Sequence, residues 1–126
     1  MTEKKVFIQE LKDGTKKMAV DIIRSCNNLE KCNTSDVVIY QFVKTCTSAA
    51  ANYQAARRAQ SQAEFFSKIC IVVEESDETE FWLELIKDSA LSDNQELLGH
   101  LLSEANEITR IMAKAKDSTY KGKRNN

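Results

Sequence analysis

Five carboxylates lie within seven positions of residues 74–82 (EESDETEFW). Carboxylates at this density could ligate a metal ion, share a proton in acid–base catalysis, or coat the solvent face of a helix. The segment follows an apolar run at residues 69–73 (ICIVV) and contains a Phe-Trp pair at its end. Which role the acids can have depends on the element that carries them.

The pattern around these acids does not predict a catalytic or metal site. A dinuclear carboxylate site in a helical bundle needs inward glutamates, with Glu-x-x-His on two helices. The chain has one histidine, His100, and Glu96 precedes it by four residues rather than three. On a helix of roughly 3.6 residues per turn the acids point in several directions. No nucleophile–base set or glycine-rich phosphate loop accompanies them, so we expect no catalytic residue, no metal and no cofactor.

The four cysteines, Cys26, Cys32, Cys46 and Cys70, lack the C-x-x-C spacing of zinc sites. In a reducing compartment Cys46 and Cys70 are expected to be small buried apolar residues, and disulfides are the less favoured interpretation. The N-terminal residues lack the apolar core of a signal peptide. No apolar run approaches the roughly 20 residues of a membrane helix. We therefore expect a cytoplasmic protein that does not enter the membrane.

The composition predicts a helical protein. The 126 residues include no proline and three glycines, and 42% are hydrophobic and 29% charged. This balance is typical of a soluble helical domain, and the chain is long enough for one compact core. We predict an all-α, antiparallel up-and-down four-helix bundle as a single domain over residues 1–120. A basic, disordered tail is expected at residues 121–126.

Apolar periodicity places the first two helices. The first is expected over residues 3–29, with a weak point at Gly14. The second is expected over residues 36–59, with Ser35 as its N-cap.

Capping residues place the other two helices. Ser61 and Glu64 form an S-x-x-E capping box, which predicts a third helix from Ser61 to about residue 89. After a break at residues 90–94, Ser92 or Asp93 is expected to cap the fourth helix.

Antiparallel packing about a turn near residue 60 places Asp77 level with Lys44. It also places Ser76 opposite a run of small residues at 45–51 (TCTSAAA). The polar middle of the third helix is thus expected to meet a small-residue surface, within the bundle or across a subunit boundary. Phe81 and Trp82 fit either a core or an interface, where aromatic residues are enriched.

Residues 52–85 (NYQAARRAQSQAEFFSKICIVVEESDETEFWLEL) resemble the bacterial four-helix-bundle family named after proteins encoded in 23S rRNA intervening sequences, also called S23 proteins. Residues 11–24 (LKDGTKKMAVDIIR) resemble the first helix of that family. The resemblance implies a four-helix bundle and a ring-like homopentamer. A distantly similar branch, the accessory variability proteins of diversity-generating retroelements, forms a basic pentameric barrel that binds nucleic acid and a reverse transcriptase.

Charge is segregated along the chain. Residues 1–60 carry ten Lys and Arg against six Asp and Glu, residues 61–100 carry two against ten, and residues 101–126 carry six against three. Such polarity can organise assembly or bind a charged partner. The candidate partner-binding residues are Arg57, Arg58, Lys16, Lys17 and Lys44. Alternatively, the two arginines pair with nearby acids and fix the turn between the second and third helices, or they pair with an acid on the next subunit.

The expected function is that of a non-enzymatic, oligomeric binding or scaffolding module. The residues expected to mark helix packing or subunit contacts are Asn52, Tyr53, Asp77, Glu78, Phe81 and Trp82. The alternative is a nucleic-acid-binding protein, with rRNA or a retroelement ribonucleoprotein as the partner. The net charge of −1 lacks the basic excess that such binding usually needs.

Overall fold

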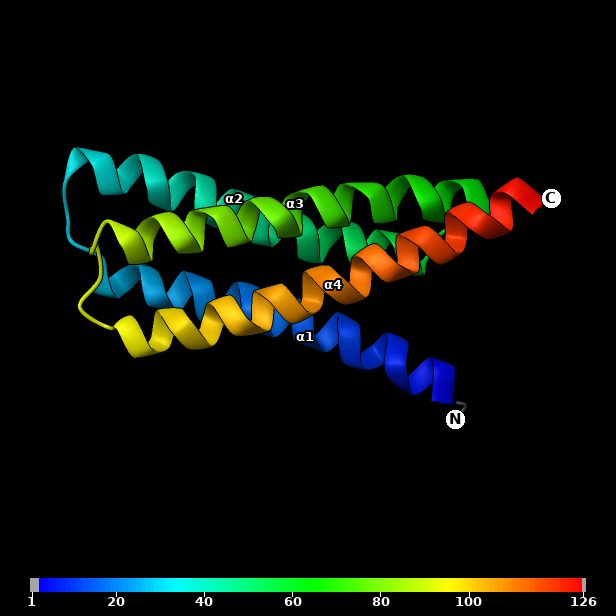
Figure 1. The fold of residues 1–126 in the computed structure, drawn as a ribbon, viewed down its shortest axis with the longest axis horizontal. Coiled ribbons are helices and arrows are strands. Elements are labelled where there is room, and N and C mark those ends of the chain that lie inside the picture. Colours follow the sequence, from blue (N-terminus) through cyan, green and yellow to red (C-terminus); the bar gives the residue numbers. More distant parts are fainter. Residues whose placement is uncertain (1–2, 126) are drawn as a thin grey trace.

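The chain forms a four-helix bundle. A computed structural model describes the backbone of residues 3–125 and the side chains of residues 9–120. The helices α1 (Glu3–Ser25), α2 (Asn33–Arg57), α3 (Gln62–Asp88) and α4 (Gln95–Asn125) run alternately up and down (Figure 1). Each helix packs against its two neighbours, most extensively α2 against α3 and α3 against α4. The prediction of an all-α, up-and-down four-helix bundle is confirmed.

The helix α3 starts where its capping residues predict, directly after Ser61. Ser61 has an extended backbone, and its Oγ accepts a hydrogen bond from the N–H of Glu64 at 3.0 Å. The Glu64 carboxylate accepts the backbone N–H of Gln60 at 3.1 Å. The serine cap is confirmed, whereas the glutamate satisfies the residue before the cap rather than the cap itself.

Ser35 does not cap α2, so that prediction was wrong. The helix begins earlier, and Cys32 is its N-cap, with φ −160° and ψ 171°. Ser35 lies buried in the first turn, where its Oγ accepts the N–H of Cys32 and donates to the carbonyl of Cys32, both at 2.9 Å. Ser35 is therefore the N3 residue of a capping box, in which its side chain accepts the N–H of the cap residue.

The prediction for the start of α4 was also wrong. Asn94, rather than Ser92 or Asp93, supplies the cap, because its Oδ1 accepts the N–H of Leu97 at 3.0 Å. Ser92 instead accepts the N–H of Asn94 at 3.1 Å and holds the turn before the helix.

The ends of the first and last helices differ from expectation. α1 is continuous through Gly14 but ends at Ser25, because η1 (Cys26–Asn28) tightens into a 3-10 turn and Leu29 becomes extended. The backbone of α4 is helical to Asn125, whereas the sequence predicts a disordered tail at residues 121–126. The side chains of residues 121–126 lie outside the described part of the chain.

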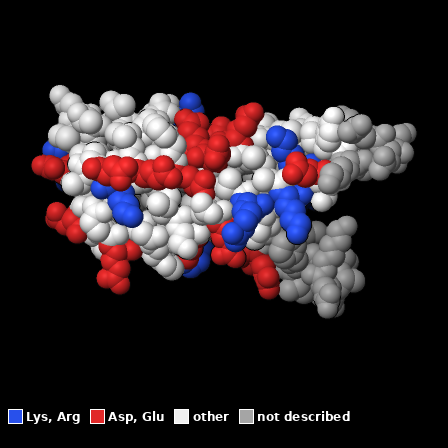
Figure 2. All heavy atoms as spheres, viewed as in Figure 1, with Lys and Arg blue, Asp and Glu red and all other residues white. Residues whose placement is uncertain are grey.

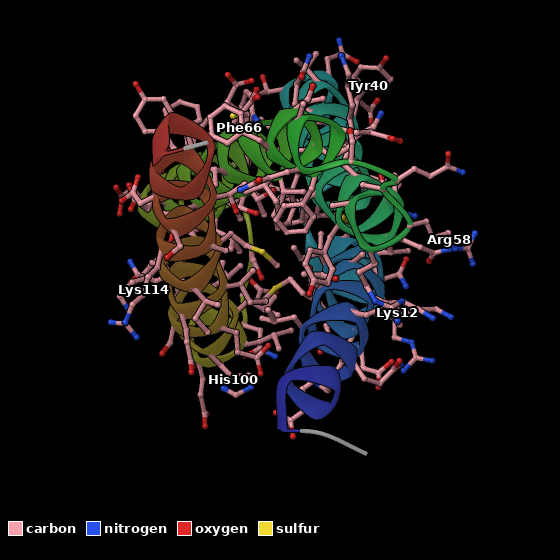
Figure 3. The ribbon with its side chains drawn as sticks, turned by 90° about the vertical axis from the view of Figure 1, so that its right-hand side faces the viewer. Lys12, Tyr40, Arg58, Phe66, His100 and Lys114 are labelled. Atoms are coloured by element: carbon pink, nitrogen blue, oxygen red, sulfur yellow. The ribbon has the colours of Figure 1, made fainter. Side chains whose placement is uncertain are left out.

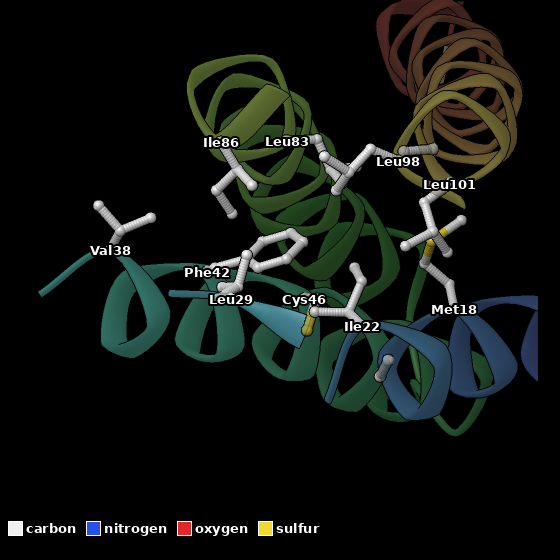
Figure 4. Packing of buried hydrophobic residues seen from close by; sticks show 12 residues of the cluster. Met18, Ile22, Leu29, Val38, Phe42, Cys46, Leu83, Ile86, Leu98 and Leu101 are labelled. Atoms are coloured by element: carbon white, nitrogen blue, oxygen red, sulfur yellow. The ribbon is translucent and has the colours of Figure 1, made fainter. Parts of the chain in front are cut away.

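Two apolar clusters fill the bundle. The larger one lies toward the end of the bundle where α3 joins α4, and Figure 4 shows the packing of its members, among them Met18, Ile22, Phe42, Leu83, Ile86 and Leu101. The smaller one lies toward the connection between α2 and α3 and consists of Tyr53, Ala56, Ile69, Val72 and Met112.

A buried layer of small and hydroxyl-bearing residues also lines the interior. The Thr79 hydroxyl of α3 donates to Oγ1 of Thr45 in α2 at 3.1 Å. Ser76 and Thr79 also line a cavity of ≈ 20 Å³ with Cys46 and Ala49. The polar middle of α3 therefore meets the small-residue run of α2 within the bundle. Cys46 is buried as expected, whereas Cys70 is only partly buried.

The turn after α3 contains a left-handed alanine. Ala90 has φ 56°, and the N–H of Leu91 donates back to the carbonyl of Ile86 at 3.3 Å. This geometry is that of a helix-ending turn in which glycine is preferred. A left-handed conformation costs an alanine roughly 1–2 kcal/mol, because its Cβ crowds the following carbonyl.

We expect Ala90→Gly to raise the free energy of unfolding by about 0.5–1 kcal/mol, because the strain relieved exceeds the entropy that glycine adds to the unfolded chain. Urea unfolding measures this change. The matched control is Ala51→Gly at an exposed site inside α2. There glycine should lower the free energy of unfolding by about 1 kcal/mol. A loss of stability in Ala90→Gly would contradict the assignment of strain.

Candidate functional site

The acidic segment lies on α3, and its side chains diverge. Glu74, Asp77 and Glu78 are exposed, whereas Glu75 and Glu80 are partly buried on the flanks of the helix. Figure 2 shows acidic side chains gathered along the course of α3. Among the described residues, no three of His, Cys, Asp and Glu lie together in a way that could hold a metal ion.

Two acids on the flanks of α3 have perturbed pKa values. Burial raises the pKa of Glu75, Glu78 adds to the rise, and Lys44 opposes it. The sequence predicts that Lys44 lies level with Asp77. In the structure Lys44 instead acts on the pKa of Glu75, two residues earlier on α3. Burial also raises the pKa of Glu80, one of whose carboxylate oxygens is buried with no hydrogen-bond partner among the described residues.

The aromatic pair on α3 divides between core and surface. Trp82 packs against the larger apolar cluster, and its Nε1 is buried with no hydrogen-bond partner in the described part of the chain. Phe81 is 52% exposed and meets Trp82 edge to face, with ring centroids 5.0 Å apart. The core interpretation therefore fits Trp82, whereas a subunit contact of the exposed Phe81 stays a prediction.

The other residues of the expected packing signature divide in the same way. Tyr53 is buried in the smaller apolar cluster, and Asn52 donates from Nδ2 to the carbonyl of Ser48 within α2 at 2.9 Å. Asp77 and Glu78 lie at the surface. A role in subunit contacts is thus sterically open to Asp77, Glu78 and Phe81.

The two candidate arginines point in different directions. Arg58 extends outward on the same side of the bundle as Lys12 (Figure 3). Arg57 turns inward, where Nη2 donates to Oε1 of Gln9 in α1 at a long 3.4 Å and Nε is buried. Neither guanidinium forms an ion pair with an acid among the residues whose side chains are described. Where side chains are described, pairing with nearby acids therefore does not account for the arginines.

The candidate lysines are also spread over the surface. Lys16 is exposed on α1, and Lys44 is exposed on α2 beside Glu75. Lys17 forms an ion pair with Asp21 at 2.7 Å, and the hydrogen bond that its Nζ donates to the Asp21 carboxylate raises the pKa of Lys17. The five candidate cations therefore do not converge on a single site within one subunit.

The structure reveals two outer surfaces with opposite charge. We define the α3 face as Glu74, Asp77, Glu78, Phe81 and Leu85, and the α1 face as Lys16, Val20, Ile23 and Arg24. All nine side chains are exposed, and each face combines apolar groups with one sign of charge. Both α1 and α3 pack against α2 and α4, so they are diagonal in the bundle and their outer faces point away from each other.

Sequence reasoning missed the apolar half of the α1 face. Val20 and Ile23 are 37% and 47% exposed, although Met18 and Ile22 beside them are core residues. The signal was available, because residues one or two positions from a core residue lie about 100° or 200° around the helix. Apolar residues off the core stripe are therefore candidates for a surface contact.

Comparisons with known proteins agree with the fold. A family model described as 23S rRNA-intervening sequence protein matches residues 10–114. Among solved structures, a protein of unknown function from the S23 ribosomal protein family of Bacteroides thetaiotaomicron VPI-5482 is similar, with a TM-score of 0.76 and 29% identity. That similarity covers 84% of this chain and 97% of the other. A search of the curated proteins finds no match.

The raised pKa of Glu80 predicts a pH-dependent effect on stability. In the folded chain Glu80 holds a proton more readily than in the unfolded chain, so its ionisation lowers stability as pH rises through the raised pKa. Below the ordinary pKa of 4.5 this effect is absent. We expect Glu80→Gln to raise the urea midpoint at pH 7 and to resemble wild type near about pH 4.

The matched control is Asp88→Asn at an exposed position of the same helix, where a smaller change is expected. A Glu80→Gln effect of the same size at both pH values would show that the carboxylate charge is not its cause.

Proposed function

Since the chain belongs to the family of 23S rRNA-intervening sequence proteins, we propose that it is a non-enzymatic helical module that self-associates and presents repeated copies of its charged surfaces to a macromolecular partner. The observation that carries this proposal is the complementarity of the α1 and α3 faces. Repetition lets contacts that are weak in one subunit add up in the assembly.

The two faces suit each other in charge and in apolar content. The α3 face surrounds Phe81 and Leu85 with carboxylates, whereas the α1 face surrounds Val20 and Ile23 with Lys16 and Arg24. Docking the α3 face of one copy on the α1 face of the next removes apolar surface from water. The same docking brings opposite charges together, which favours this register over contacts between like faces.

The positions of the faces determine the kind of assembly. A contact between two different faces is heterologous, and its repetition gives a closed ring or an open filament. The family resemblance favours a ring, with five subunits as the expected number. The divergence of the α3 acids supports a non-enzymatic role, because exposed carboxylates around a helix suit a charged contact surface.

Charge reversal tests the self-association. Lys16→Glu and Glu78→Lys are each expected to weaken assembly by about tenfold or more, because each places like charges across the contact. The double variant carries both reversals and should recover assembly in part, since the two reversed side chains again attract each other. Sedimentation velocity at low and near-physiological salt measures the distribution of species.

The control for charge reversal as such is Glu107→Lys, on the exposed side of α4 and outside both faces. A monomeric wild-type protein, or equal dissociation by Glu107→Lys, would refute the contact between the α1 and α3 faces.

Nucleic-acid binding is a second candidate function, favoured by cations around one end of the bundle, of which Arg58 and Lys114 are exposed. Arg58 and Lys12 lie on one side of this end, and Lys114 of α4 lies on the other (Figure 3). An oligomer would repeat these cations. Phosphate binding by such groups releases counterions and therefore weakens steeply with salt.

We expect the double variant Arg58→Ala/Lys114→Ala to weaken binding to a structured rRNA fragment, measured by fluorescence anisotropy. The slope of log affinity against log salt should fall by about two, one for each lost phosphate contact. Lys17→Ala is the control, because Lys17 already pairs with Asp21. No binding by wild type even at low salt would exclude this candidate and leave self-association unaffected.

A further inference from the structure

The helices α1 and α4 diverge at one end of the bundle (Figure 1). A groove of ≈ 520 Å³ opens at this end. All four helices contribute to it, and most of its wall is apolar. The apolar side chains that line it are Leu11, Tyr53, Ala56, Ala59, Phe65, Ile69, Met112 and Ala115. Its volume lies in the range of about 300–1,000 Å³ that is usual for small-molecule sites.

One charged side chain lines the groove among the described residues, and it is Arg57. Its Nε is buried and has no hydrogen-bond partner in the described part of the chain. Its Nη2 reaches Oε1 of Gln9 at 3.4 Å, which is long for a hydrogen bond, and no described acid pairs with it. The side chain is only partly buried, so its Nη groups can donate to an anion in the groove.

The lining indicates the chemistry of the ligand. An apolar wall favours an apolar body, and a single guanidinium favours a single negative charge, which it can bind with two parallel hydrogen bonds. A polyphosphate would bring several charges to a groove with one described cation. Ser118 and Thr119 add hydroxyl groups to the lining of the same groove.

We propose that this groove binds a small amphipathic carboxylic acid, with its apolar chain against the partly exposed Leu11 and Phe65 and its carboxylate on Arg57. The site lies apart from the α1 and α3 faces, so it goes beyond the proposed function and can be tested separately. Arg57 is the last residue of α2, next to the turn into α3. This position brings its side chain to the groove beside Phe65 of α3.

Decanoate is the probe, titrated into the full-length protein by isothermal titration calorimetry, with 1-decanol as its uncharged counterpart. We expect decanoate to bind, and Arg57→Gln to weaken it by about tenfold or more through loss of a charge-assisted contact. Binding of 1-decanol should not change in this variant. Arg58→Gln is the matched control, because the neighbouring arginine does not line the groove, and it should leave decanoate affinity unchanged.

A second variant blocks the groove. Ala115→Phe adds a ring to the lining and should abolish binding of both probes, with its thermal unfolding midpoint as the check of folding. The methyl NMR signal of Met112 reports occupancy directly and does not depend on any variant. We expect decanoate to shift it strongly in wild type.

Three results would overturn the proposal. The first is no shift of the Met112 signal with decanoate at millimolar concentration. The second is undiminished decanoate binding in both Arg57→Gln and folded Ala115→Phe. The third is a pair of observations: Ala115→Phe dissociates an oligomer, and decanoate competes with self-association of the wild-type protein. That result would assign the groove to a second copy of the chain.

Discussion

The buried hydrogen bond between Thr79 and Thr45, 3.1 Å long, couples α2 to α3 in the middle of the bundle. Once Thr79 and Ser76 point inward, the helical period also turns Val72 and Leu83 into the core. The same period turns Phe81 and the acids of the α3 face outward. The acidic surface is therefore a consequence of how the interior is packed, and its density needs no catalytic explanation.

The two ends of the bundle differ for a related reason. At one end the larger apolar cluster fills the interior, and the N–H of Glu30 donates to the carbonyl of Leu91 at 2.8 Å, joining two connections. At the other end α1 and α4 diverge (Figure 1), and the smaller cluster leaves the groove around Arg57. One end thus holds the helices together, while the other offers space and exposed cations.

The sequence predicts the features that depend on local pattern. The four helices, the serine cap of α3 and the contact of its polar middle with small residues all follow from periodicity and capping chemistry. The caps of α2 and α4 did not follow, because Ser35 and Ser92 can satisfy backbone groups from positions other than the cap itself. Adjacent side chains on a helix lie about 100° apart, which separates Trp82 from Phe81 and Arg57 from Arg58. The groove could not be predicted, because it arises from the divergence of two helices distant in sequence.

In the proposed assembly the α1 face of one copy contacts the α3 face of another. Zero-length carbodiimide crosslinking of an equal mixture of ¹⁴N- and ¹⁵N-labelled protein, read by mass spectrometry, tests this contact most directly. If these faces meet, mixed-isotope crosslinks will join Lys16 to Glu74, Asp77 or Glu78. Their absence, with mixed-isotope crosslinks only between other surfaces, would contradict it.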